Sequence, residues 1–149
     1  MLGGLTVDER ACLRKHARGV HLDIGTWDGG SAAEAAEVCD LVFTLDKSLK
    51  HYDVRKVHSH LWKKIIPYEV DSHGWISPKM KFDSAFVDGD HTHAGCLQDL
   101  RLAANLKADV ILVHDMDLEA VEKAVAEFGW KTIDKADKMV VLKRGADTP

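Results

Sequence analysis

Two kinds of segment alternate along the chain. Short runs of nearly continuous apolar residues lie at 19–25, 41–46, 64–72, 81–90 and 109–115. Between them, apolar residues recur every three or four positions, which is the spacing of one helix face. Buried strands separated by amphipathic helices are typical of a parallel sheet covered on both faces.

The expected helices cover 6–17, 31–39, 47–61, 94–106 and 117–128. Two of them begin with a capping-box pattern, in which a hydroxyl residue stands three positions before a glutamate. Thr6 precedes Glu9 in this way, and Ser31 precedes Glu34. Asp117 is the expected N-cap of the last helix.

The end of the chain predicts a different pairing. Residues 130–134 and 138–145 read as a closing hairpin after Gly129, which ends the last helix. Pro67 lies in the third apolar run, and because proline donates no ladder hydrogen bond, we expect that strand at a sheet edge. The predicted fold is α/β: a doubly wound, mostly parallel Rossmann-like sheet with a C-terminal antiparallel hairpin and helices on both faces. One domain spans 1–149.

Composition narrows the function classes. The formal net charge is -4 and no basic stripe is present, so we expect no nucleic-acid partner. The N-terminal segment has no long apolar run, so we expect neither a signal peptide nor a membrane span, and a cytoplasmic location. Cys12, Cys39 and Cys96 form no Cys-x-x-Cys pair, which indicates neither a zinc site nor a disulfide framework.

The main functional signal is the acid at or near the end of each apolar run. These acids are Asp23, Asp46, Asp71, Asp88 and Asp115. Ligands of parallel α/β sheets bind outside the carboxyl ends of the strands. We therefore expect the five carboxylates to surround one ligand site.

The first strand leads into a glycine turn, "HLDIGTWDGGS". A dinucleotide fingerprint needs a second glycine so that the backbone can approach a pyrophosphate, but Trp27 stands there. The turn instead has Gly25 and Gly29, which favours a nucleoside ligand without phosphates. Asp46 ends the next strand, where an acid accepts hydrogen bonds from ribose hydroxyls. The alternative for the glycine turn is an ordinary tight connection between a strand and a helix. The alternative for Asp46 is a cap on the helix that follows it.

Five segments resemble the successive signatures of class I S-adenosylmethionine-dependent methyltransferases: "LDIGTWDGGSA", "LDKS", "VDSHGW", "FDSAFVDGDHTHAG" and "VILVHDM". The subgroup they resemble is that of small-molecule O-methyltransferase-like proteins with a DGDH-type segment. The resemblance covers roughly residues 20–145. S-adenosylmethionine carries adenosine and no phosphate, which agrees with Trp27 in the turn.

This resemblance implies roles for the strand-end residues. The glycine loop would hold the methionine end, Asp46 the ribose, Asp71 and Ser72 the adenine, and Asp88 the region below the sulfonium. The implied cofactor-binding residues are Asp23, Gly25, Trp27, Gly29, Ser31, Asp46, Lys47, Asp71, Ser72 and Asp88. The chain departs from the family pattern at His93, where an aromatic residue is usual, and at Met116.

Methyl transfer to a hydroxyl requires an aligned acceptor and a base for its proton. His91 and His114 are the candidate catalytic residues, because histidine titrates near neutral pH and both lie at strand ends. The alternative for His91 is a hydrogen bond that holds its own loop. The alternative for His114 is a satisfied core histidine.

Some methyltransferases of the family that the chain resembles bind a divalent cation such as Mg²⁺, which prefers several oxygen ligands. Asp88, Asp90 and Asp115 are the candidate metal ligands. The alternative is cofactor binding alone, since Asp88 already has a place near the methionine. His51, His58 and His60 are expected to be solvated surface residues.

These observations favour an S-adenosylmethionine-dependent methyltransferase that methylates a hydroxyl of a small-molecule acceptor. The alternative is a non-catalytic S-adenosylmethionine- or nucleoside-binding module, or a partner subunit. With 149 residues, the core fold leaves little chain to cover a substrate, so a second subunit, including a homo-oligomer partner, is one way to complete the site.

Overall fold

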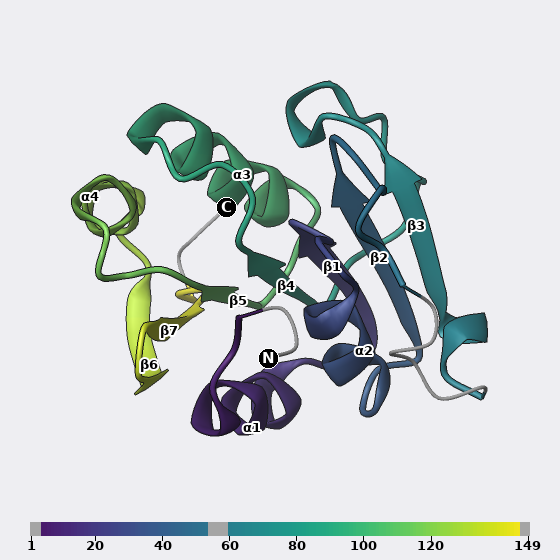
Figure 1. Cartoon of the computed structure of the whole chain (residues 1–149). Helices are drawn as coiled ribbons and strands as arrows, with labels where there is room; N and C mark the ends of the chain where they lie inside the picture. Colours follow the sequence, from purple (N-terminus) through teal and green to yellow (C-terminus); the bar gives the residue numbers. More distant parts are fainter. Residues whose placement is uncertain (1–3, 54–59, 147–149) are drawn as a thin grey trace.

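A seven-stranded sheet forms the centre of the molecule, with helices packed on both of its faces (Figure 1). The structure is a computed structural model that describes residues 4–53 and 60–146. The strand order is β3-β2-β1-β4-β5-β7-β6. The predicted doubly wound α/β fold is confirmed.

The strands are β1 Val20–Ile24, β2 Leu41–Asp46, β3 Ile65–Glu69, β4 Ser84–Val87, β5 Val110–Val113, β6 Lys131–Ala136 and β7 Met139–Lys143. The first five pair in parallel, and β7 pairs antiparallel with both β5 and β6. The strand that contains Pro67, β3, lies at an edge as predicted. Because β1 lies between β2 and β4, the winding reverses there, which is where such sheets bind ligands.

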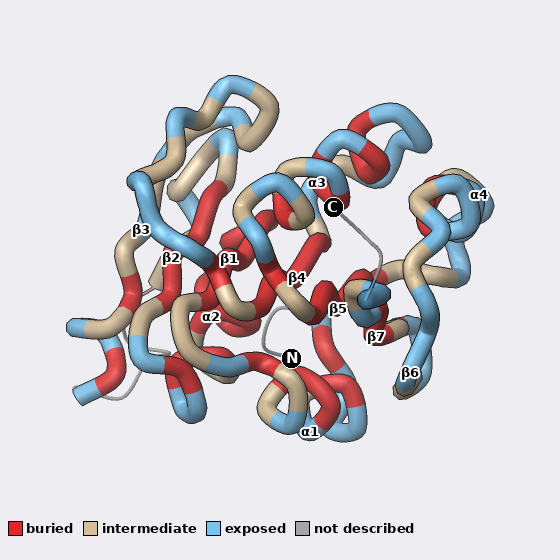
Figure 2. The backbone as a smooth tube through the Cα atoms, turned by 180° about the vertical axis from the view of Figure 1, so that it is seen from behind, coloured by how far each residue is buried: buried red, intermediate tan, exposed pale blue. Residues whose placement is uncertain are grey.

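The helices are α1 Val7–His16, α2 Gly30–Ala36, α3 His93–Asn105 and α4 Glu119–Phe128, with short 3₁₀ helices η2 Trp62–Lys64 and η3 Ser72–Gly74. α1 contacts α2 on one face of the sheet, and α3 contacts α4 on the other. Buried residues concentrate on the central strands and on the helix surfaces that face them (Figure 2). In β4, Phe86 packs towards α1 and α2, whereas Ala85 and Val87 pack towards α3. Within the described ranges, no helix has the length and apolarity needed to cross a membrane.

The helix caps match the sequence pattern only in part. The capping box of Thr6 and Glu9 is present at α1, and Gly129 ends α4 in the left-handed conformation. The capping box expected at Ser31 is wrong, because Gly29 is the N-cap of α2 and α2 ends at Ala36. The reason is that the Ser31 hydroxyl donates to a buried carboxylate of β1 instead.

Two further expectations about helix starts are wrong. Leu118, not Asp117, precedes the first residue of α4, and Asp117 lies 3.4 Å from Lys138. No helix forms over 47–53, while 54–59 of the helix expected there, with His58, lie outside the described residues. Backbone N–H groups in 47–53 bond outside any helix: that of Ser48 donates to Asp46, and that of Leu49 to Glu69.

Candidate functional site

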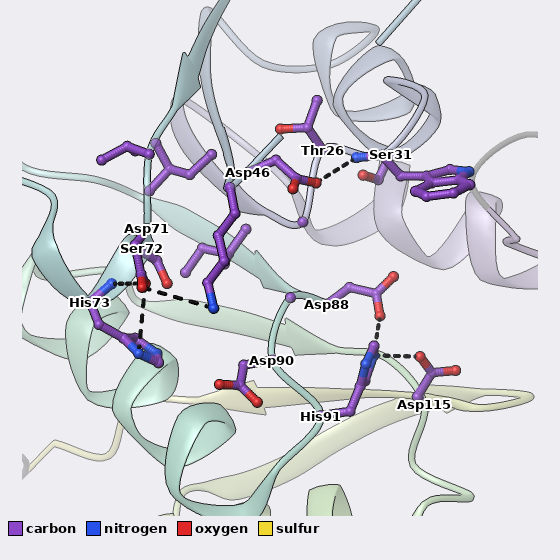
Figure 3. Close-up of a pocket in the computed structure, with 17 residues that line it drawn as sticks. Thr26, Ser31, Asp46, Asp71, Ser72, His73, Asp88, Asp90, His91 and Asp115 are labelled. Atoms are coloured by element: carbon purple, nitrogen blue, oxygen red, sulfur yellow. Dashed lines mark hydrogen bonds and ion pairs between the residues drawn. The ribbon is translucent and has the colours of Figure 1, made fainter. Parts of the chain in front are cut away.

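A cleft of about 520 Å³ opens at the carboxyl ends of the parallel strands (Figure 3). It is lined by the residues that follow β1, β2, β3, β4 and β5. The sequence-predicted site residues that line it are Gly25, Trp27, Ser31, Asp46, Lys47, Asp71, Ser72, Asp88, Asp90, His91 and Asp115. Asp23, Gly29 and His114 are not among the lining residues. The fold thus brings the predicted strand-end acids to one edge of the sheet.

Asp23 lies beneath the glycine loop and is fully buried. Its carboxylate accepts hydrogen bonds from the Ser31 hydroxyl at 2.7 Å and the Thr44 hydroxyl at 2.5 Å. Because Thr44 uses its proton on Asp23, the Thr26 hydroxyl, 2.7 Å away, donates to Thr44. Burial raises the pKa of Asp23 to about 7 against the effect of these hydroxyl donors. Asp23 therefore holds the loop and the start of α2 from below.

The glycine turn depends on backbone conformations that side chains rarely adopt. Gly25 has a φ of +101°, and a Cβ there would lie 2.2 Å from the carbonyl oxygen of Asp88. Gly29 has a φ of +94°. Trp27 also has a positive φ, 47°, and its side chain is 56% exposed with its ring 4.1 Å from that of His51. A bulky residue in the left-handed region costs free energy, so the surrounding turn must hold Trp27 in this conformation.

Asp46 joins the glycine turn to the end of β2. Its carboxylate accepts the backbone N–H of Trp27 at 3.0 Å and that of Ser48 at 3.1 Å. A carboxylate has about four acceptor positions, so Asp46 can accept further hydrogen bonds from a ligand in the cleft. The alternative role of Asp46, as cap of a following helix, is not met over 47–53, where no helix forms.

Asp71, Ser72 and His73 form the far side of the cleft around η3. Asp71 caps this 3₁₀ helix by accepting the backbone N–H of His73 at 3.0 Å, and it lies 3.8 Å from Lys47. Beneath it, Asp99 on α3 is fully buried and accepts the Ser72 hydroxyl at 2.6 Å, with His73 Nε2 3.2 Å away. Burial raises the pKa of Asp99.

Asp99 and His73 were missed by the sequence reasoning. Asp99 lies 27 residues from its partner Ser72 and follows no strand, so no strand-end pattern marks it. The second carboxylate oxygen of Asp99 is buried without a hydrogen-bond partner among the described residues. Because Asp99 belongs to α3 and accepts the hydroxyl of Ser72, α3 helps to fix the Ser72 side of the cleft.

His91 lies between two carboxylates at the other end of the cleft (Figure 3). Its Nε2 is 3.2 Å from Asp88 Oδ1 and 2.8 Å from Asp115 Oδ2. The hydrogen bond with Asp88 raises the pKa of His91. Burial would raise the pKa of Asp88, but the neighbouring imidazoles of His114 and His91 hold it below its usual value. The imidazole is thus oriented by acids, and its side chain is 42% exposed towards the cleft.

His114 lies behind this group and is buried. Its Nε2 is 3.0 Å from Glu9 Oε2, and its Nδ1 is 3.3 Å from Asp115 Oδ1. Although burial opposes the charged form, the neighbouring Asp88, Asp115 and Glu9 raise the pKa of His114 to about 9. Glu9, from α1, is itself buried and also accepts the backbone N–H of Lys138. The sequence marked Glu9 only as a capping residue, because its contact with His114 spans 105 positions.

The set of three aspartates expected for Mg²⁺ is not assembled. The Asp90 carboxylate accepts the backbone N–H and the hydroxyl of Thr92 at the start of α3, at 2.9 and 2.7 Å. Both hydrogen bonds end on Asp90 Oδ1, and Asp90 does not belong to the group of ligand atoms that lie close together. The ligand atoms that lie within 4.8 Å of one another belong to Asp88, His114 and Asp115, and His91 lies between the two carboxylates. This arrangement does not fit a hard cation that prefers several oxygen ligands.

Comparison with known proteins identifies the fold. No protein-family model matches the chain, and no curated protein matches it. An O-methyltransferase from Streptomyces achromogenes involved in tomaymycin synthesis, in complex with S-adenosylmethionine, has a TM-score of 0.69 at 15% identity, covering 95% of this chain and 82% of that chain. An O-methyltransferase from Bacillus cereus in complex with S-adenosylhomocysteine has a TM-score of 0.68 at 17% identity, covering 94% and 82%.

A third solved structure widens the comparison. An rRNA methylase from Streptococcus thermophilus has a TM-score of 0.61 at 12% identity, covering 91% of this chain and 93% of that chain. The chain therefore has the Rossmann-like fold of these methyltransferases. Since the same fold carries proteins named for different acceptors, the residues of the site must decide the function.

Proposed function

We propose that this protein is an S-adenosylmethionine-dependent methyltransferase that methylates a hydroxyl group of a small molecule. The observation that carries the proposal is the convergence of Gly25, Asp46, Asp71 and Asp88 on one cleft at the reversal point of the sheet. Its volume of about 520 Å³ is within the usual range for sites of small ligands. Two solved structures of the same fold, named with S-adenosylmethionine and S-adenosylhomocysteine, support the choice of cofactor.

The lining residues suit an adenosyl ligand without phosphates. Asp46 would accept hydrogen bonds from the ribose hydroxyls, and Asp71 and Ser72 would border the adenine. Trp27 is where a dinucleotide site needs glycine, so its side chain disfavours a pyrophosphate at the turn. The loop from Gly25 to Ser31, held from below by Asp23, would hold the methionine end beside Asp88.

When bound, S-adenosylmethionine supplies a methyl group on a sulfonium, which is transferred by in-line displacement. The chain must orient the acceptor oxygen and take up its proton. With the Nε2–H of His91 directed at Asp88 and Asp115, Nδ1 is the nitrogen that would accept the hydroxyl proton. The products are a methyl ether and S-adenosylhomocysteine, and the proton passes from His91 to solvent.

His91 acts as a base only when it is neutral. Because its pKa is raised above 6.5 by Asp88, the rate of methyl transfer should increase as the pH rises through that raised pKa. His91→Gln should lower the rate by about 10²- to 10⁴-fold and remove this pH dependence. His93→Gln is the matched control, since His93 is also partly exposed and lies 3.5 Å from Glu127 on the outer helices.

The test is to incubate the protein with S-adenosylmethionine and a panel of hydroxylated small molecules, and to detect S-adenosylhomocysteine and methylated product by mass spectrometry. Product formation that depends on His91 supports the proposal. Trp27 and His91 line the cleft but are exposed to solvent, so this chain alone leaves the cleft partly uncovered. This favours one alternative, a non-catalytic S-adenosylmethionine-binding module or partner subunit. Binding of the cofactor with no product from any acceptor would favour that alternative.

A further inference from the structure

A second group of metal-ligating side chains lies away from the cleft, where α1 packs against β6. Cys12 and His16 are four positions apart on α1, so their side chains lie one helical turn apart on the same face. Asp134, on β6, approaches from the other side. The sulfur, an imidazole nitrogen and a carboxylate oxygen of these residues all lie within 4.8 Å of one another. The fold assembles this group from positions that are far apart in the sequence.

The three side chains are partly enclosed and already ordered. Cys12 is 7% exposed, and the side chains of His16 and Asp134 are 13% and 31% exposed. His16 Nε2 lies 2.8 Å from Asp134 Oδ2, and Asp134 Oδ1 accepts the backbone N–H of Lys135 at 2.9 Å. Lys15 also contacts Asp134, at 3.3 Å, but its side chain is 70% exposed and can move into solvent.

The donor set identifies the class of ion. Thiolate, imidazole and carboxylate are the three side-chain ligands of zinc, whereas magnesium and calcium prefer oxygen alone. Although the lack of a Cys-x-x-Cys pair in the sequence indicates no zinc site, we propose that Cys12, His16 and Asp134 form a Zn²⁺-binding site with a fourth position open to solvent. The site shares no residue with the cleft and does not depend on the proposed methyltransferase activity.

Zinc binding at this position would release protons. Burial, together with the charge of Asp134, raises the pKa of the Cys12 thiol, so the sulfur is protonated without a metal. On coordination the thiol proton passes to solvent and the sulfur binds as thiolate. Affinity should therefore increase with pH.

The site would tie α1 to the C-terminal hairpin. These two elements also meet at Glu9, which accepts the backbone N–H of Lys138 at the turn of the hairpin and contacts His114 behind the cleft. A bound ion would stabilise the same junction from the far end of α1. Zn²⁺ should accordingly raise the thermal unfolding midpoint of the whole domain.

The experiment is a titration of the metal-free protein with Co²⁺, which replaces zinc and gives near-ultraviolet thiolate-to-cobalt absorption only when a cysteine is a ligand. We expect this band in the wild-type protein and its displacement by Zn²⁺. Cys12→Ser should abolish the band, whereas Cys39→Ser should retain it, because Cys39 is an equally buried free cysteine elsewhere. Asp134→Asn, a change at a partly exposed position, should weaken cobalt binding at least about tenfold.

Circular dichroism shows whether each variant is folded, and Asp134→Asn keeps the test decisive if Cys12→Ser does not fold. Cobalt bound at Asp88, His114 and Asp115 gives no thiolate band, so metal in the cleft is not mistaken for this site. Absence of the band in the wild type overturns the proposal. Persistence of the band in folded Cys12→Ser, or full affinity in Asp134→Asn, overturns it as well.

Discussion

At the scale of single residues, identical side chains at strand ends have different environments. Asp23 is buried under hydroxyl groups, Asp46 faces the cleft, and Asp90 accepts hydrogen bonds from Thr92, the N-cap of α3. The sequence predicted that these acids would share one edge, because the carboxyl ends of parallel strands do so. The sequence could not predict which carboxylate would point into the cleft. The direction of each carboxylate depends on its hydrogen-bond partners, such as Thr44 and Thr92, and no sequence motif marks these partners.

The first prediction concerns Asp46. Asp46→Asn should weaken S-adenosylmethionine binding roughly 10- to 100-fold, because hydrogen bonds from the ribose to a charged acceptor would be lost. Isothermal titration calorimetry gives the affinity. Asp40→Asn is the matched control, since Asp40 is exposed just before the other end of β2 and should leave the affinity unchanged. Equal affinities of the two variants would contradict the ribose assignment.

At the scale of elements, the alternation of strands and helices was predictable from apolar spacing, whereas several helix starts were not. Thr6 and Glu9 form the expected capping box, but Ser31 has the same pattern and instead bonds to Asp23. A local motif predicts a local contact only when no stronger tertiary partner competes, and a buried carboxylate is such a partner. Residues 47–53, after Asp46, also form no helix, and Glu69 on β3 accepts the backbone N–H of Leu49 there.

The close approach of the loops after β1 and β4 gives the second prediction. Gly25→Ala should destabilise the protein by about 2 kcal/mol or more, because its φ is +101° and the new Cβ would lie 2.2 Å from the Asp88 carbonyl. Gly74→Ala should change stability by less than about 0.5 kcal/mol, since a Cβ there meets nothing within 4 Å. Urea unfolding followed by circular dichroism measures both. A Gly25 variant as stable as the Gly74 variant would show that the two loops are not in fixed contact.

At the scale of the whole molecule, α1 and the C-terminal hairpin complete the site from behind. Glu9 joins the backbone of Lys138 to His114, which in turn contacts Asp115 beside the cleft. The sequence predicted the helix and the hairpin but not this connection, since buried ion pairs between distant segments have no spacing rule. For the same reason, the sequence did not predict that Asp134 lies next to Cys12 in the folded protein.

This connection predicts how stability depends on pH. The pKa of His114 is raised from 6.5 to about 9 in the folded protein, so its stabilising contribution is fully present below pH 6.5 and is lost as the pH rises through about 9. The free energy of unfolding should therefore fall over this window, on the order of 1–3 kcal/mol more steeply in the wild type than in His114→Gln. Urea unfolding below pH 6.5 and above pH 9 measures the difference. Parallel pH profiles for the two proteins would contradict a charged His114, and His93→Gln should behave as the wild type.

Calorimetric titration of the purified protein with S-adenosylmethionine and with S-adenosylhomocysteine tests the central claim most directly. The account predicts that each binds one site per chain with micromolar affinity, that the two compete, and that NAD⁺ does not displace them, because Trp27 obstructs a pyrophosphate. Binding of neither adenosyl compound, or tighter binding of NAD⁺ than of both, would contradict it.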